Sequence, residues 1–128
     1  MKPKYFWMLS CGVIAIALSF LLSTSALAAY SGYYSGTMTY GNSQFATGDH
    51  DSSYPYATVS VNSGCSDGGT FWYEQVGGGR CTTVATISPR VTKTFSYTKN
   101  FSGGVQLWGT SSGSGSHSVS GSWRSNVK

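Results

Sequence analysis

One stretch of the chain has the spacing of a catalytic motif. The sequence GTSSG at residues 109–113 matches the G-x-S-x-G pattern that carries the nucleophile of serine hydrolases. That nucleophile needs a strand-to-helix turn in a large α/β sheet, whereas this stretch belongs to a tract of serine and glycine. We therefore interpret the match as coincidental.

Asp49, His50 and Asp51 offer ligands for a metal or partners for acid–base chemistry. In an extended strand His50 would point away from both carboxylates, and the small polar neighbours indicate a loop. We expect a structural or solvated role for these residues, and a partly buried, hydrogen-bonded imidazole for His117, the only other histidine. The sequence therefore predicts no enzyme: no catalytic residue, no cofactor and no metal site.

Cys65 and Cys81 are the only cysteines outside the N-terminal segment, and the aromatic triplet Phe71-Trp72-Tyr73 lies between them with glycines on both sides. Outside the cytoplasm such a pair predicts a disulfide. Closing a loop of about 15 residues stabilises a fold by roughly 3 kcal/mol. Two thiols without a nearby histidine do not make a zinc site.

The disulfide and a regular hairpin exclude one another. In a hairpin of residues 70–76 and 81–88, the two cysteines would lie at opposite ends, roughly 17 Å apart at about 3.3 Å per residue, whereas a disulfide needs Cα atoms within about 7 Å. Either the hairpin is ordinary and the thiols stay apart, or the chain leaves the sheet as a stapled loop with the aromatic triplet near its tip. We favour the stapled loop, because paired glycines suit the base of a loop better than a strand interior.

The N-terminus has the features of a secretory signal peptide covering residues 1–28. Lys2 and Lys4 precede an apolar run, and Ala26-Leu27-Ala28 supplies small residues for cleavage after Ala28 or Ala29. An uncleaved membrane anchor is the alternative. We expect residues 29–128 to be one secreted domain that does not span a membrane. Its six basic and four acidic residues make a charge of +2, too weak for nucleic acid but mildly favourable for an anionic surface.

Beyond residue 28 the sequence pattern predicts β-strands. Apolar residues alternate with polar ones, as at Ala57, Val59 and Val61. The predicted strands cover residues 34–41, 55–62, 70–76, 81–88, 91–101, 104–109 and 116–124, and residues 109–116 form a flexible Ser/Gly connector. This pattern predicts an all-β fold, a small antiparallel β-sandwich or barrel-like domain.

Aromatic residues are the strongest indication of function, because three Trp, eight Tyr and four Phe follow residue 29. Tyrosines among serine and glycine, as at Tyr30, Tyr33 and Tyr34, suit partner binding, and aromatic faces suit sugar rings. Their alternative role is to cover the outer sheet faces as cross-strand pairs. The predicted binding residues are Phe71, Trp72, Tyr73, Tyr54 and Tyr56.

Three stretches resemble the lactococcin 972 family of secreted bacteriocins in order and spacing: GTMTYG at 36–41, HDSSYPYATVSVNSG at 50–64 and ATISPRVTKTFSYTKNF at 85–101. The resemblance implies a β-sandwich without catalytic residues that interferes with cell-wall synthesis, through a wall precursor such as lipid II. Our leading expectation is a secreted antibacterial protein that binds the envelope of a competing Gram-positive bacterium. The alternatives are a non-catalytic module that binds a glycan or inhibits a protease, and a structural cell-surface protein.

Overall fold

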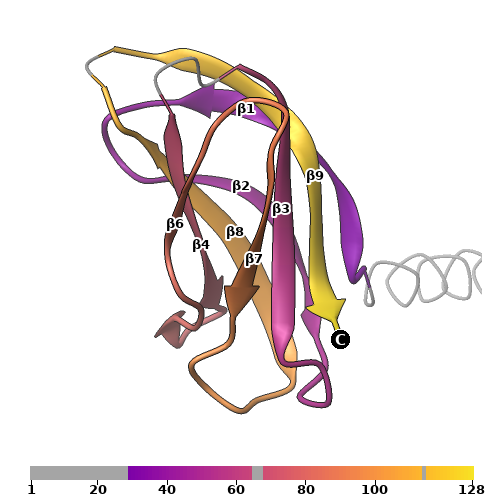
Figure 1. The fold of residues 1–128 in the computed structure, drawn as a ribbon. Coiled ribbons are helices and arrows are strands. Elements are labelled where there is room, and N and C mark those ends of the chain that lie inside the picture. The colour runs from indigo at the N-terminus through magenta and orange to yellow at the C-terminus, as the bar shows by residue number, and fades with distance from the viewer. Residues whose placement is uncertain (1–28, 65–67, 114) are drawn as a thin grey trace, which may run out of the picture.

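The computed structural model of the chain describes residues 29–64, 68–113 and 115–128, which form two antiparallel β-sheets packed face to face (Figure 1). The predicted all-β fold is thereby confirmed as a sandwich. The predicted signal peptide and Cys65 lie outside the described residues. In the described part no helix is long and apolar enough to cross a membrane.

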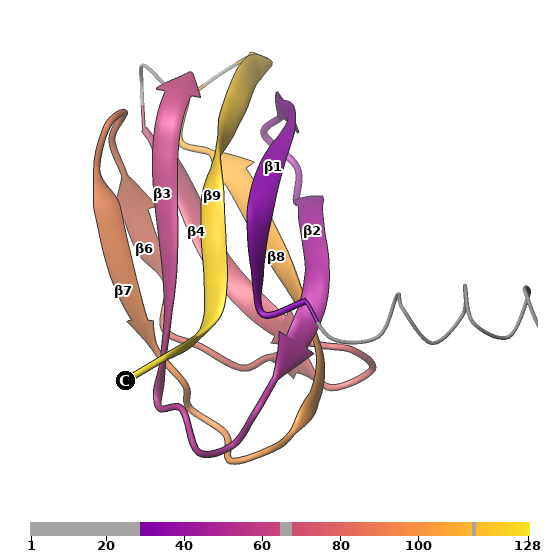
Figure 2. The same ribbon diagram turned by 90° about the vertical axis from the view of Figure 1, so that its right-hand side faces the viewer.

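The strands are β1 (Ser31–Met38), β2 (Ser43–His50), β3 (Tyr56–Gly64), β4 (Gly69–Gln75), β5 (Gly79–Arg80), β6 (Ala85–Ile87), β7 (Thr92–Ser96), β8 (Gly103–Ser111) and β9 (His117–Val127). Sheet A has the order β1-β9-β3-β7, and sheet B has the order β2-β8-β4-β5, with β6 also paired to β4. Figure 2 looks onto sheet A with sheet B behind it. The first and last strands are therefore neighbours in sheet A.

The core lies between the sheets and follows the alternation in the sequence. Ala57, Val59 and Val61 of β3 are fully buried, as their shared face predicts. Phe71 and Tyr73 of β4 face them from sheet B, and the Tyr73 hydroxyl donates to the Thr58 carbonyl at 2.8 Å. The polar side chains of these strands are left on the outer faces.

The predicted stapled loop is wrong, because its residues form the central strand of sheet B. β4 pairs with β8 on one side and with β5 and β6 on the other. The ordinary hairpin is thus the correct alternative, although after Cys81 the chain turns from β4 toward the end of β7, where Thr83 N–H donates to the Ser96 carbonyl at 2.9 Å. Three consecutive aromatic residues favour such a strand, whose two faces are both covered.

The predicted disulfide is not supported. Cys81 carries a free thiol and is fully buried, directly after β5. It lies at the turn end of the β4–β5 hairpin, where its N–H donates to the Tyr73 carbonyl at 3.0 Å. Burial raises the pKa of this thiol to about 12.

Several strands also differ from the prediction: β1 covers residues 31–38 instead of 34–41, and β7 ends at residue 96 instead of 101. Residues 43–50 form β2, a strand that we did not predict and whose end includes Asp49 and His50, where we expected a polar loop. A register shift between Gln44 and Ala46 interrupts the alternation by which strands are recognised. The predicted connector begins too early, since residues 109–111 belong to β8. Gly109 sits against the core, where an added Cβ would lie 2.8 Å from Met38 Cε. It is there for close packing.

Candidate functional site

The aromatic triplet that we expected to make contacts is buried. Phe71 and Tyr73 face the core, and Trp72 points to the outer face of sheet B with only 4% of its surface exposed. The Trp72 indole N–H donates to Glu74 Oε2 at 3.2 Å, and the Arg80 guanidinium carbon lies 5.2 Å from the Trp72 ring centroid. Its position in the middle of a sheet leaves the triplet no loop tip from which to reach a partner.

Tyr54 and Tyr56 lie apart from the triplet, at the start of β3 in sheet A. Tyr56 is 40% exposed, and the Lys128 ammonium lies 5.3 Å from the Tyr54 ring centroid. The sequence therefore grouped residues that the fold separates. A binding role for these two tyrosines stays a prediction.

Asp49, His50 and Asp51 line one depression of about 450 Å³ at the end of β2, together with Tyr30 and Ser102. His50 is 3% exposed, stacks on Tyr97 at 3.7 Å between ring centroids, and has its Nδ1 3.1 Å from Asn126 Oδ1. Because that oxygen is an acceptor, Nδ1 carries the proton, and His50 ties β2 to the end of β9. Asp51 accepts hydrogen bonds from the N–H and hydroxyl of Ser53, which lower the pKa of its carboxyl. No group of described residues could hold a metal ion.

The outer face of sheet A is covered by small polar side chains, and we call it the hydroxyl face. Its side chains come from alternate positions of all four strands: Tyr33, Ser35 and Thr37 of β1, Ser118, Ser120 and Ser122 of β9, Thr58, Ser60 and Asn62 of β3, and Thr92, Thr94 and Ser96 of β7. Some hydroxyls bond to one another, as Ser60 and Thr92 do at 2.6 Å. Most inward positions of the same strands are apolar or glycine, with the buried Ser125 of β9 as an exception, so this face follows largely from the alternation.

A depression of about 330 Å³ opens in the hydroxyl face, and we call it the Tyr33 hollow. It is lined by Tyr33, Tyr34, Ser35, Asn62, Ser120 and Gly121. Gly121 of β9 is essential to its floor, because an added Cβ would lie 1.8 Å from the Ser60 carbonyl oxygen and 2.8 Å from the Tyr34 hydroxyl. That hydroxyl passes beneath β9 from β1 and donates to the Ser60 carbonyl at 3.0 Å.

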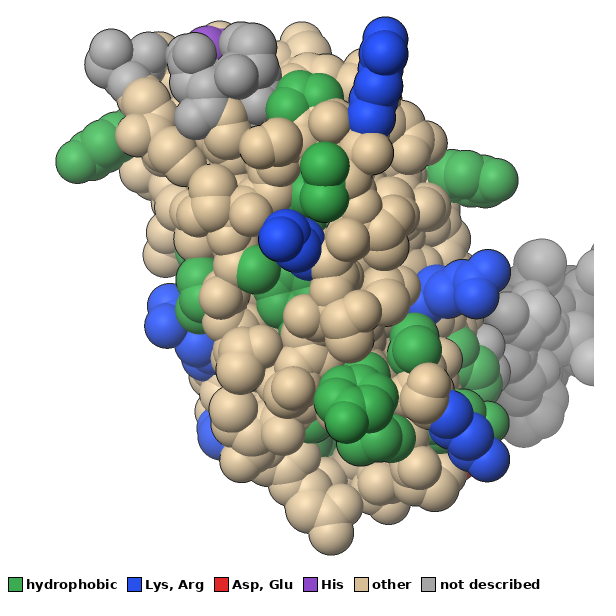
Figure 3. Space-filling view, viewed as in Figure 1, with side chains coloured by type: hydrophobic (Ala, Val, Ile, Leu, Met, Phe, Trp, Pro, Cys, Tyr) green, Lys and Arg blue, Asp and Glu red, His purple; other side chains and the backbone are tan. Residues whose placement is uncertain are grey.

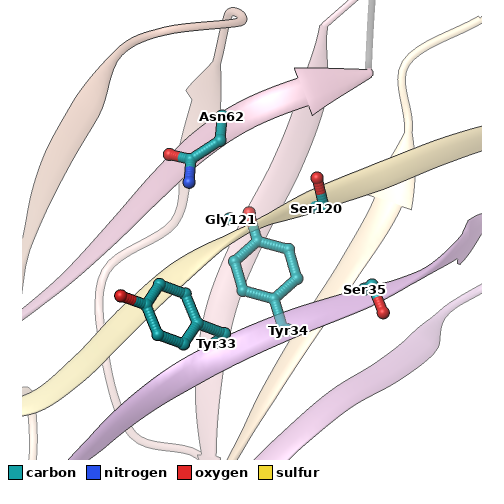
Figure 4. A pocket seen from close by; sticks show the side chains of 6 residues that line it. All are labelled: Tyr33, Tyr34, Ser35, Asn62, Ser120 and Gly121. Carbon is teal, nitrogen blue, oxygen red and sulfur yellow. The ribbon is translucent and has the colours of Figure 1, made fainter.

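The walls of the Tyr33 hollow combine an aromatic ring, an amide and hydroxyls. Figure 4 shows Tyr33 and Asn62 on opposite sides of β9, with Gly121 between them and Ser35 and Ser120 on the rim. Tyr33 is 87% exposed. Asn62 lies at a register shift between β3 and β9, and its side chain is therefore outside the regular cross-strand pairing. None of the lining side chains carries a charge.

This arrangement suits the binding of a polar ring such as a sugar. An exposed tyrosine offers a flat apolar surface and a hydroxyl, while the Asn62 amide both donates and accepts hydrogen bonds. The sequence indicated the tyrosine cluster around Tyr33, although Tyr34 is buried. It did not indicate Asn62, Ser120 or Gly121, because only strand pairing places β9 between β1 and β3 and so brings these residues to one hollow with Tyr33.

Comparisons with solved structures give a distant similarity. No family model matches the sequence, and no curated protein is similar to it. A solved chain from the work "Bacillus endospore appendages form a novel family of disulfide-linked pili" superposes with a TM-score of 0.40 and 16% identity, over 77% of this chain and 86% of that chain.

Proposed function

We propose that this chain is a secreted, non-catalytic binding module that recognises a glycan through the Tyr33 hollow. The observation that supports this proposal is the 87% exposure of Tyr33 beside an amide and hydroxyls in an uncharged depression. A sugar ring has a C–H face that can pack on the tyrosine ring and hydroxyls that can bond to Asn62, Ser35 and Ser120.

The sheet holds these groups in place before a ligand arrives. Tyr33 pairs with Ser122 and Ser35 pairs with Ser120, so β1 and β9 fix their spacing. Binding to groups on rigid strands loses little conformational entropy. Because the hollow is shallow and contacts one side of a ligand, we expect modest affinity per sugar and stronger binding to a polymer that offers repeated units.

Removal of the Tyr33 ring tests the proposal. Protein secreted from the full-length gene would be titrated with a panel of soluble polysaccharides and sedimented with insoluble cell-wall material. Tyr33→Ala should weaken binding to the recognised glycan at least tenfold, because the ring supplies the main apolar contact of the hollow.

Tyr40→Ala is the matched control, since Tyr40 is 79% exposed but lies in the β1–β2 turn outside the hollow. Binding by this variant should equal that of the unchanged protein. The proposal fails if no glycan in a broad panel is bound, or if Tyr33→Ala and Tyr40→Ala bind equally well.

The structure bears differently on two other functions expected from the sequence, protease inhibition and antibacterial action. Protease inhibition by a stapled aromatic loop has lost its basis, because those residues form β4. Antibacterial action at a cell envelope rests on the lactococcin 972 resemblance and stays a prediction. An inhibition-zone assay on Gram-positive strains would test it directly.

A further inference from the structure

The two sheets differ in charge, although sheet B also carries the cation Arg80 on β5. All three described carboxylate side chains, Asp49, Asp51 and Glu74, lie on a strand of sheet B or directly after one. The strands of sheet A contain no acidic residue and carry Lys93 and Arg124, with Arg90 and Lys128 just beyond strand ends. Figure 3 views an edge of the sandwich, a quarter turn from the outer face of sheet A, and shows Lys and Arg side chains and no Asp or Glu there. On the outer face of sheet A, the strands place Arg124, whereas Lys93 pairs with the inward-facing Val59.

Arg124 stands beside the Tyr33 hollow. It is exposed on β9, where its partners on the adjacent strands are Ser31 of β1 and Thr58 of β3. Tyr33 pairs with Ser122, two residues before Arg124, so the two side chains are diagonal neighbours on one face. Cβ atoms in such positions lie about 7–8 Å apart or less, within reach of long side chains.

We propose that the glycan is an acidic polysaccharide whose sugar ring lies on Tyr33 while its carboxylate pairs with Arg124. The inference rests on the proposed function and names its ligand class. In a uronic acid the carboxyl group is bonded directly to the sugar ring, which suits the short separation of Tyr33 and Arg124. The guanidinium presents paired N–H donors that match a carboxylate.

The remaining cations of sheet A act at longer range. Lys93, Arg90 and Lys128 lie outside the hollow, and their field raises the concentration of a polyanion near the surface without direct contact. Salt should therefore weaken binding partly, whereas the ring contact on Tyr33 should persist. Binding that depends on both a charge and a ring distinguishes this site from a simple basic patch.

Polygalacturonate and the same polymer with its carboxyl groups reduced to alcohols form a matched pair of probes. Full-chain secreted protein would be titrated with both. We expect at least tenfold tighter binding to the carboxylated polymer. Arg124→Gln should remove this preference and leave the weaker binding to the reduced polymer unchanged. Lys99→Gln removes an equal charge outside sheet A and should keep the preference.

Four outcomes would overturn the inference. Equal binding to both polymers would refute the charge requirement and leave the glycan proposal intact. If the protein binds neither polymer and no glycan in the broad panel, both the charge requirement and the glycan proposal are refuted. Polygalacturonate binding that survives Tyr33→Ala but vanishes in salt would show charge attraction alone. Self-association in sedimentation velocity that Tyr33→Ala abolishes would assign the hollow to a second copy of the chain.

Discussion

Aromatic residues on the outer faces of the two sheets differ in exposure: Trp72 on sheet B is buried, whereas Tyr33 on sheet A is exposed. On sheet B, Trp72 pairs with Trp108, and each indole N–H donates to an acceptor two residues along its own strand, Glu74 for one and Gln106 for the other. On sheet A, Tyr33 is flanked by small side chains and stays 87% exposed. An aromatic residue on a sheet face thus becomes a contact site only where its neighbours do not cover it.

Trp72→Ala should give the largest difference between the two faces. Because Trp72 is 4% exposed, losing its side chain should lower the free energy of unfolding by about 3 kcal/mol. Tyr33→Ala should change it by less than about 0.5 kcal/mol, since little area is buried there. Urea unfolding of both variants measures this, and equal losses would show that the faces do not differ.

Gly121→Ala should have the next largest effect. Its methyl group would collide with the Ser60 carbonyl, so β3 and β9 must separate, which costs about 1–3 kcal/mol. The same shift should distort the hollow and weaken glycan binding. Gly41→Ala is the control, because there the nearest atom is 3.8 Å from the added Cβ. An unchanged thermal unfolding temperature in both variants would contradict the close contact between Gly121 and the Ser60 carbonyl.

The buried Cys81 thiol predicts a smaller effect that depends on pH. Burial raises its pKa from 9.0 to about 12, so the folded state favours the neutral thiol. Its contribution to stability is complete below pH 9 and is lost as pH rises toward 12. In a Cys65→Ser variant, thiol labelling at pH 8 should need denaturant, and mass spectrometry measures it. Rapid labelling of the native protein would contradict the burial.

Local pattern was sufficient for part of the fold. Val59 and Val61 alternate with polar residues, and such alternation identifies a strand with one buried face wherever it is regular. It failed at Gln44 and Ala46, where a register shift removes the alternation. Around Trp72 the pattern did indicate a strand, but the paired glycines and the expected disulfide led us to favour a stapled loop for these residues, which form β4.

The candidate site was less accessible to sequence reasoning than the fold. The tyrosine cluster pointed to Tyr33, but Tyr34 next to it faces the core, because adjacent strand residues point to opposite sides. Asn62 and Arg124 carry no local signal, being single polar residues among many. Their roles follow from β9 lying between β1 and β3.

The sequence alone determined that the chain is rich in strands and which side chains share a strand face. It also determined that hydroxyls lie opposite the apolar positions, because alternation is a property of neighbouring residues. The tertiary structure decided which strands meet and which aromatic ring stays uncovered. Those outcomes depend on pairing between distant segments such as β1 and β9, and a strand's pattern does not specify its partner.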